Sequence, residues 1–207
     1  MTDAGYTLLD RSTGERLVRY ARAVIEAELD GRARPASPFD DGPATERRGA
    51  FVTLKREDDL RGCIGRPRPR LQLPESVAEA AVGAATDDPR FPALDPAELP
   101  SVTVSVSALT KPQSIDVTDP QAYADDIEVG RDGLIVEQEG RRGLLLPQVA
   151  VEQGWDVTTF IEQTARKARL RPAAWKDERT SIRRFSAQVF EERAPNGEIS
   201  ETNFLES

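Results

Sequence analysis

The stretch FVTLKREDDLRGCIG, residues 51–65, holds two apolar runs separated by charged residues. Residues 51–54 and 60–64 are rich in side chains that favour strands, and residues 56–59 are typical of a polar turn. We therefore predict an antiparallel hairpin. Its second strand carries Cys63, the only cysteine of the chain, next to glycines.

Helical patterns lie on both sides of this hairpin. Ser12 and Glu15 have the spacing of a capping box, and apolar residues follow at helical spacing. A second helix is predicted from Pro74, with an alanine-rich face that suits close packing. A third is predicted after residue 155, with Asp156 or Thr158 as its cap.

The rest of the chain adds further strands. Five segments are β-branched or alternate in polarity: residues 102–109, 127–129, 133–136, 143–146 and 182–190. The polar tail from Ala194 onward is expected to fray. Strands and helices intermix without a regular βαβ repeat, which predicts an α+β fold with mainly antiparallel sheet flanked by helices.

The composition limits the available chemistry. The chain has 207 residues, enough for one substantial domain or two small lobes, with no histidine and one cysteine. Catalysis by Ser-His-Asp or Cys-His and imidazole metal sites are excluded, as are an internal disulfide and a cysteine-rich zinc site. Adjacent carboxylates such as Asp87 and Asp88 are interpreted as solvated turn charges. We predict no metal and no cofactor.

The formal net charge is −8. An acidic protein repels nucleic acid and anionic membranes, so nucleic acid is a poor candidate partner. RNA binding stays only as a third alternative, resting on the basic segment RPRPR at residues 66–70 and the pair Arg47–Arg48. Because arginine strongly outnumbers lysine, we also hypothesise a salt-rich cytoplasm, as in a halophilic archaeon, or a GC-rich genome.

The sequence gives no sign of export or membrane insertion. It has no apolar run approaching the roughly 20 residues that a membrane-spanning helix needs. The first residues lack the basic and then apolar layout of a signal peptide. A cytoplasmic location is the expectation.

Five blocks occur in an order and spacing that resemble the AMMECR domain family, over about residues 6–191. The form that it resembles is the stand-alone prokaryotic one called AmmeMemoRadiSam system protein A. The blocks are LRGCIG (60–65), DDPRFPAL (87–94), VSVSALT (104–110), GLLLPQVA (143–150), and the stretch from WDVTTFIEQTARKARL (155–170) to FSAQVF (185–190).

The resemblance implies a single AMMECR-type domain with two interwoven lobes, the segment 127–146 belonging to the smaller one. It implies no reaction, but it suggests two partners, a Memo-like protein and a radical SAM protein. The chain departs from the family pattern at Arg66–Pro67, Ala165 and Arg169. Ala165 stands where the family often has a second cysteine, so Cys63 would act alone or with a partner's thiol.

Cys63 has two interpretations. A cysteine in the middle of a strand between apolar neighbours is most often a small buried hydrophobe, which we favour. The alternative is a reactive or ligand-contacting thiol. Gly62 and Gly65 suit either one, because bare backbone fits a bulge, a close packing contact or a ligand. On a regular strand Arg61 shares a face with Cys63 and can activate it.

Two arginines and one glutamine complete the candidate site. An arginine fork binds carboxylate or phosphate. For Arg90, in the rigid turn DPRFP, an internal salt bridge is the favoured interpretation, whereas for Arg61 both roles stay open. Gln148 is a candidate pocket residue. Ser105 and Ser107 lack a base and are interpreted as cross-strand hydrogen-bonding groups.

We therefore expect an accessory or binding protein that holds a small anionic ligand or a partner segment at a cleft around LRGCIG. Arg61 would contact the anion, Gly62 and Gly65 would admit it, Cys63 would line the cleft and Arg90 would support its wall. The alternative is an enzyme that uses Cys63 as nucleophile or thiol carrier.

Overall fold

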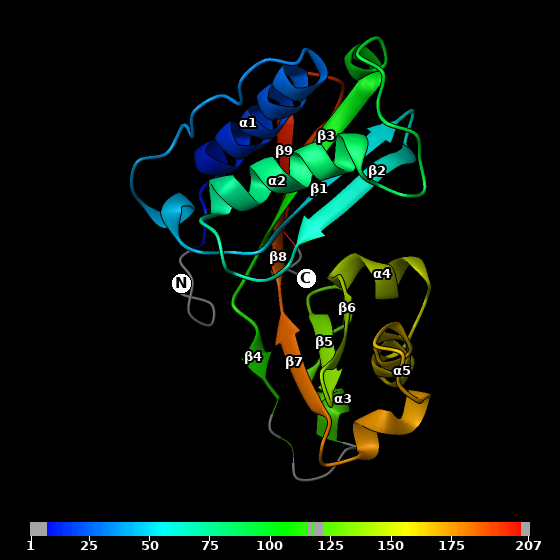
Figure 1. The fold of residues 1–207 in the computed structure, drawn as a ribbon. Coiled ribbons are helices and arrows are strands. Elements are labelled where there is room, and N and C mark those ends of the chain that lie inside the picture. The colour runs from blue at the N-terminus through cyan, green and yellow to red at the C-terminus, as the bar shows by residue number, and fades with distance from the viewer. Residues whose placement is uncertain (1–7, 116, 118–121, 204–207) are drawn as a thin grey trace. The chain divides into compact units, whose positions relative to one another are not determined.

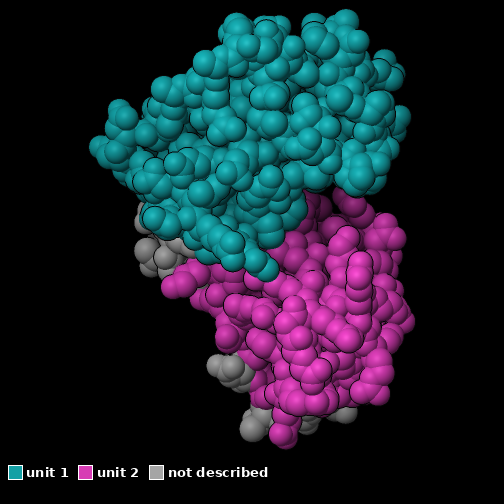
Figure 2. Space-filling view, in the orientation of Figure 1, with its two compact units in different colours: residues 1–109, 188–203 teal, residues 110–187, 204–207 magenta. Residues whose placement is uncertain are grey.

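The computed structural model describes residues 8–115, 117 and 122–203. The chain divides into two units, each with its own sheet and core, coloured separately in Figure 2. Unit 1 comprises residues 1–109 and 188–203, and unit 2 comprises residues 110–187 and 204–207. The predicted α+β class is confirmed, with helices packed on antiparallel sheets.

Unit 1 contains a five-stranded sheet in the order β2-β1-β3-β8-β9, with two helices on one face (Figure 1). The strands are β1 (Ala50–Arg56), β2 (Asp59–Arg66), β3 (Val102–Leu109), β8 (Ala187–Glu192) and β9 (Ile199–Asn203). The helices are α1 (Arg11–Leu29), α2 (Leu73–Thr86) and the short 3-10 turns η1 (Pro43–Thr45) and η2 (Leu99–Ser101). Val52, Leu54 and Val104 of the sheet pack against Leu17 and Val77 of the helices.

Two predictions in unit 1 need correction. The cap of α1 is Asp10, whose carboxylate accepts a hydrogen bond from the Thr13 N–H at 2.7 Å, and not Ser12. Within the tail predicted to fray, residues 199–203 instead form β9, which pairs antiparallel with β8, and residues 204–207 lie outside the described residues. The buried Ile199 of β9 joins the core, and this apolar anchor outweighs the polar composition around it.

Unit 2 contains a four-stranded sheet in the order β4-β7-β5-β6. The strands are β4 (Gln113–Ser114), β5 (Gly133–Gln138), β6 (Arg141–Leu145) and β7 (Ser181–Phe185). The helices are α3 (Tyr123–Asp126), α4 (Pro147–Glu152), α5 (Val157–Lys167) and the 3-10 helix η4 (Pro172–Lys176). Asp156 caps α5, as one of the two predicted alternatives, and Phe160 and Ile161 of α5 are buried in the core.

Two strand predictions in unit 2 differ from the structure. Residues 127–129 follow α3 without forming a strand, and β7 is the neighbour of β5. The strand predicted over residues 182–190 is two strands, because the chain leaves one sheet and enters the other at Ser186. The Ser186 N–H donates to Oγ1 of Thr110 at 2.7 Å, and the Thr110 N–H donates to the Ser186 carbonyl at 2.8 Å.

Within the described residues, none of the helices is both long and apolar enough to cross a membrane.

Candidate functional site

The hairpin of β1 and β2 contains a bulge that decides where its side chains point. Glu57 and Asp58 form the turn with positive φ angles of 51° and 68°. Positive φ at both positions gives a two-residue turn whose twist matches that of the flanking strands. Lys55 pairs with Leu60, but Leu54 already pairs with Gly62. Arg61 is therefore the extra residue of a β-bulge, a feature that redirects a side chain.

Beyond the bulge, polar side chains line up across three strands. Cys63 of β2 pairs with Thr53 of β1, which pairs with Ser105 of β3. Directly paired residues share a face of the sheet, and Val52 and Leu54 on either side of Thr53 point to the helices. The row of Cys63, Thr53 and Ser105 thus lies on the face opposite α1 and α2.

The next row on this face is Gly65, Phe51 and Ser107. We call the face that carries these two rows the Cys63 face. Cys63 is half-buried, as are the two residues beside it in its row, and its Sγ accepts a hydrogen bond from Oγ1 of Thr53 at 3.3 Å. Cys63 therefore lies outside the hydrophobic core, in contrast to the buried position that its apolar neighbours favoured.

Both glycines of β2 have internal packing partners. A side chain at Gly62 would place its Cβ 2.1 Å from the carbonyl oxygen of Ala84, because the end of α2 lies directly over this strand. A side chain at Gly65 would meet the ring of Phe51, also at 2.1 Å. Close packing within the chain therefore accounts for the absence of a side chain at both positions.

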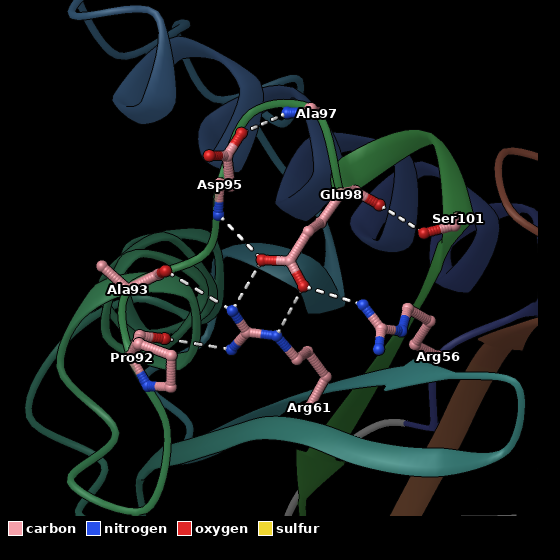
Figure 3. A network of polar contacts seen from close by, with 8 residues as sticks. All are labelled: Arg56, Arg61, Pro92, Ala93, Asp95, Ala97, Glu98 and Ser101. Atoms are coloured by element: carbon pink, nitrogen blue, oxygen red, sulfur yellow. Dashed lines mark hydrogen bonds and ion pairs between the residues drawn. The ribbon is translucent and has the colours of Figure 1, made fainter.

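Arg61 binds a carboxylate of its own chain (Figure 3). Its Nε and Nη2 donate to Oε1 and Oε2 of Glu98 at 3.1 and 2.8 Å, and its Nη1 donates to the Pro92 carbonyl at 3.1 Å. Arg56 contacts the same carboxylate at 3.1 Å. The Arg61 side chain is only 11% exposed, so this network holds the loop before β3 against β2.

Charge pairing in this network shifts the pKa values of both Glu98 and Arg61. The hydrogen bond from Arg61, helped by the Asp95 N–H, lowers the pKa of Glu98 to about 2. The same hydrogen bond raises the pKa of Arg61 above its ordinary value. The Arg61 guanidinium is therefore engaged internally, which corresponds to one of the two roles that the sequence left open.

Asp88 and Arg90 hold the backbone of Cys63 from the outer edge of the sheet. Oδ2 of Asp88 accepts a hydrogen bond from the Cys63 N–H at 2.8 Å, and Nη2 of Arg90 donates to the Cys63 carbonyl at 3.2 Å. The two side chains pair with each other at 2.9 and 2.7 Å. This Asp88–Arg90 clasp occupies main-chain groups of an edge strand that would otherwise be open to another strand.

The clasp corrects one interpretation and agrees with another. Asp88 is not a solvated turn charge, because its side chain is only 2% exposed. Hydrogen bonds from Arg90 and from the Cys63 N–H hold its pKa well below the usual range. Arg90 forms the internal salt bridge that its rigid turn favoured. The hydrogen bond to Asp88 raises its pKa above the ordinary value. Its Nη2 donates to the Cys63 carbonyl, whereas Arg61 is engaged by Glu98, so Arg90 is the arginine that contacts Cys63.

Gln148 belongs to unit 2, whereas the other five predicted site residues belong to unit 1. It is half-buried near the start of α4, and its Oε1 is buried without a hydrogen-bond partner among the described residues.

In the described ranges, no three carboxylate or thiol side chains converge as metal ligands would. In unit 1 the arrangement offers a thiol, a hydroxyl that donates to it and a nearby guanidinium.

Three residues that shape the site escaped the sequence reasoning: Thr53, Asp88 and Glu98. A signal existed for Asp88, because it lies two residues before Arg90 in a proline-bounded turn. None existed for Glu98, which is 37 residues from Arg61. The pairing of Thr53 with Cys63 can be predicted from the hairpin only if the bulge at Arg61 is known.

The Arg61–Glu98 pair predicts a pH dependence of stability. Because the pKa of Glu98 falls from 4.5 in the unfolded chain to about 2 in the folded one, its contribution is fully present above pH 4.5 and is lost as the pH falls toward 2. We expect a loss of about 1–2 kcal/mol, allowing for solvent screening of a partly exposed pair.

Denaturant unfolding between pH 6 and pH 2.5 measures this loss. Glu98→Gln should be less stable than wild type at pH 6, with the difference shrinking toward pH 2.5. Glu79→Gln, at the exposed pair with Arg66, is the control and should change little. A constant difference between wild type and Glu98→Gln across the range would contradict the linkage.

The fold and site define an α+β protein with two antiparallel sheets, in which an edge strand with a single half-buried thiol is held by two arginine–carboxylate pairs. The chain belongs to the AMMECR1 family, whose profile matches residues 18–190. This confirms the resemblance found in the sequence.

Archaeal relatives match over nearly their whole length. Protein MJ0810 of Methanocaldococcus jannaschii is 48% identical over 96% of this chain and 99% of its own. A protein of Thermofilum pendens is 45% identical over 96% of this chain and 98% of its own. The crystal structure of uncharacterized protein PH0010 from Pyrococcus horikoshii, 45% identical, has a TM-score of 0.84 and covers 92% of this chain and 96% of that chain.

Proposed function

We propose that the protein is an accessory protein that binds a segment of a partner protein on the Cys63 face. The proposed partners are a Memo-like protein and a radical SAM protein, because the family resemblance suggests these two. Cytoplasmic residence is part of the same proposal. The competing hypothesis is that the protein binds a small anionic ligand at LRGCIG, residues 60–65.

One observation carries the choice of a partner segment. Arg61 and Arg90, the cations that an anion would need, are paired with Glu98 and Asp88 of the same chain. An external anion would have to displace an intramolecular carboxylate that is already positioned, which costs free energy. On the Cys63 face the half-buried residues are Cys63, Thr53, Ser105 and Phe51, whereas Ser107 is buried. These half-buried side chains are a mixture of apolar and hydrogen-bonding groups, which suits a protein interface.

The clasp also favours recognition through the face. An incoming peptide that added a strand to β2 would need the main-chain groups of the edge. At Cys63 both groups are already bonded to Asp88 and Arg90. Side-chain contacts on the Cys63 face require no such displacement.

A charge placed on this face tests the proposal. Ser105→Glu should weaken binding of the Memo-like or radical SAM protein by at least about tenfold, because the carboxylate would be buried unpaired in the complex. Isothermal titration calorimetry measures both affinities. Ser12→Glu, an exposed position in the first turn of α1, is the matched control and should bind as wild type.

Two results would contradict the proposal. One is a wild-type protein that binds neither partner. The other is a folded Ser105→Glu protein with wild-type affinity. Tight binding of inorganic phosphate that is abolished by Arg61→Gln would instead favour the small-anion version.

A second candidate function is an enzyme in which Cys63 is a nucleophile or thiol carrier. The Thr53 hydroxyl donates to Sγ, and the Arg90 guanidinium donates to the Cys63 carbonyl, so the thiol lies beside a hydrogen-bond donor and a cation. Mass spectrometry of the protein isolated from its own cells should then find a covalent adduct on Cys63. Cys63→Ser should keep the fold and lose the adduct. An unmodified thiol, together with wild-type function of Cys63→Ser, would exclude this candidate.

A further inference from the structure

The C-terminal end of α5 carries an exposed basic surface. The run of residues 163–176, QTARKARLRPAAWK, contains five cations and no carboxylate, in a chain whose formal net charge is −8. Arg166, Lys167 and Arg169 of this run are exposed. The exposed Arg141 of β6 joins them, because its Nη1 donates to the Arg169 carbonyl at 3.4 Å. We call these four cations the Arg169 surface.

The charges of the Arg169 surface are not balanced by ion pairs within the described ranges. The ion pairs of unit 2 engage three other arginines, namely Arg131, Arg179 and Arg183. The hydrogen bond from Arg179 and, to a lesser extent, the charge of Arg171 lower the pKa of Asp177. Arg171 is therefore partly balanced and is left out of the surface.

The helix dipole accounts for only part of the Arg169 surface. Cations in the last turn of a helix are favoured by its negative end, which explains Arg166 and Lys167. This effect fades beyond the last turn, so it does not explain Arg169, which follows the helix, or Arg141 on β6. Glu162, the single carboxylate of α5, lies one turn before Arg166, yet the two form no ion pair among the described residues. A surplus of positive charge is therefore left for a partner.

Arg169 adopts a backbone conformation that favours glycine. Its φ is +59°, in the left-handed region. The Arg169 N–H donates to the Arg166 carbonyl at 2.9 Å and the Leu170 N–H to the Ala165 carbonyl at 3.0 Å, the Schellman pattern that ends a helix. This turn lets Leu170 pack against the core of unit 2. An arginine here costs stability that glycine would not, and such a cost is typical of residues that serve a function.

We propose that the Arg169 surface binds an acidic segment of a partner protein. The carboxylates of such a segment would accept charge-assisted hydrogen bonds from the guanidinium groups of Arg169 and Arg141. The proposal does not rest on docking at the Cys63 face.

Nucleic acid suits this surface less well than an acidic protein segment does. Carboxylates outnumber cations in the rest of the chain, so a long polyanion would be repelled beyond the surface, whereas a short segment would not. Trp175 is the only aromatic residue of the run 163–176, and its side chain is 7% exposed. The run therefore offers no open ring on which a base could stack.

Three labelled probes of equal length separate the classes of partner: octaglutamate, octaglutamine and octauridylate. Fluorescence polarisation with the full chain at low salt measures the affinities. We expect octaglutamate to bind more tightly than octauridylate, and octaglutamine not to bind. Added KCl should weaken octaglutamate binding, because salt screens exposed charges.

Arg169→Gly separates a binding role from a structural one. It should weaken octaglutamate binding about threefold, the worth of one exposed charge pair. It should also raise the Tm by about 2–4 °C, because glycine adopts the left-handed backbone without strain. Adding Lys167→Gln and Arg141→Gln should weaken binding by at least about tenfold in total. Arg19→Gln, at an exposed arginine of α1, is the control and should change neither quantity.

The proposal is overturned if octaglutamate does not bind, if octauridylate binds as tightly, or if Arg19→Gln weakens binding as much as Arg169→Gly. It is also overturned if Arg169→Gly binds octaglutamate as wild type or lowers the Tm. Ser105→Glu should bind octaglutamate as wild type, which distinguishes a failure here from a failure of partner binding at the Cys63 face.

Discussion

Gly62→Ala is expected to lower the free energy of unfolding by about 3 kcal/mol, the upper part of the range for overpacked cores. The added Cβ would lie 2.1 Å from the Ala84 carbonyl oxygen, a backbone atom near the end of α2. Either the helix or β2 must shift, and both belong to the core of unit 1. Urea unfolding followed by circular dichroism measures the loss.

Gly65→Ala is the matched comparison, because its Cβ meets the ring of Phe51 and not a backbone atom. Truncating that ring, in the double variant Gly65→Ala with Phe51→Ala, should recover part of the stability lost in Gly65→Ala. Adding Phe51→Ala to Gly62→Ala should recover none. A Gly62→Ala protein as stable as wild type would show that α2 does not pack on β2 as described.

Asp88→Ala is expected to cost about 3 kcal/mol, because it leaves a main-chain donor and an arginine without their shared carboxylate. The Asp88 side chain is 2% exposed and bonds both the Cys63 N–H and Arg90. Chemical unfolding at neutral pH measures the cost. Alkylation of Cys63 should also become faster, because the edge strand loses its outer partner.

Asp88→Asn separates the two roles of this carboxylate. The amide oxygen can still accept from the Cys63 N–H, whereas the charge facing Arg90 is gone. Asp88→Asn should therefore lie between wild type and Asp88→Ala in stability. Equal stability of Asp88→Ala and wild type would mean that the Asp88–Arg90 clasp does not hold β2.

The sequence predicted the hairpin of residues 51–65 but not the side on which its cysteine lies. Counted from the turn without a bulge, Cys63 would pair with Val52 and point toward the helices. The extra residue Arg61 shifts the register by one, which moves Cys63 to the opposite face beside Thr53. A bulge leaves no reliable mark in a single sequence, so the position of the thiol could not be predicted.

Contacts that are local in sequence were predicted better than distant ones. The salt bridge of Arg90 involves Asp88, two residues away, and the rigid turn indicated it. The partner of Arg61 is 37 residues away, and many carboxylates could have served. The run 182–190 has the alternation of one strand throughout, and only the two sheets reveal that the chain changes partners at Ser186.

The most direct test of the proposed docking role is the alkylation rate of Cys63 by iodoacetamide in the native protein, alone and with the Memo-like or radical SAM partner. The chain has one cysteine, so the rate belongs to this thiol. We predict that the folded protein reacts, because Cys63 is only half-buried, and that a bound partner strongly slows the reaction. A thiol that reacts only after unfolding, or a rate unchanged in the complex, would contradict the assignment of the Cys63 face as the docking surface.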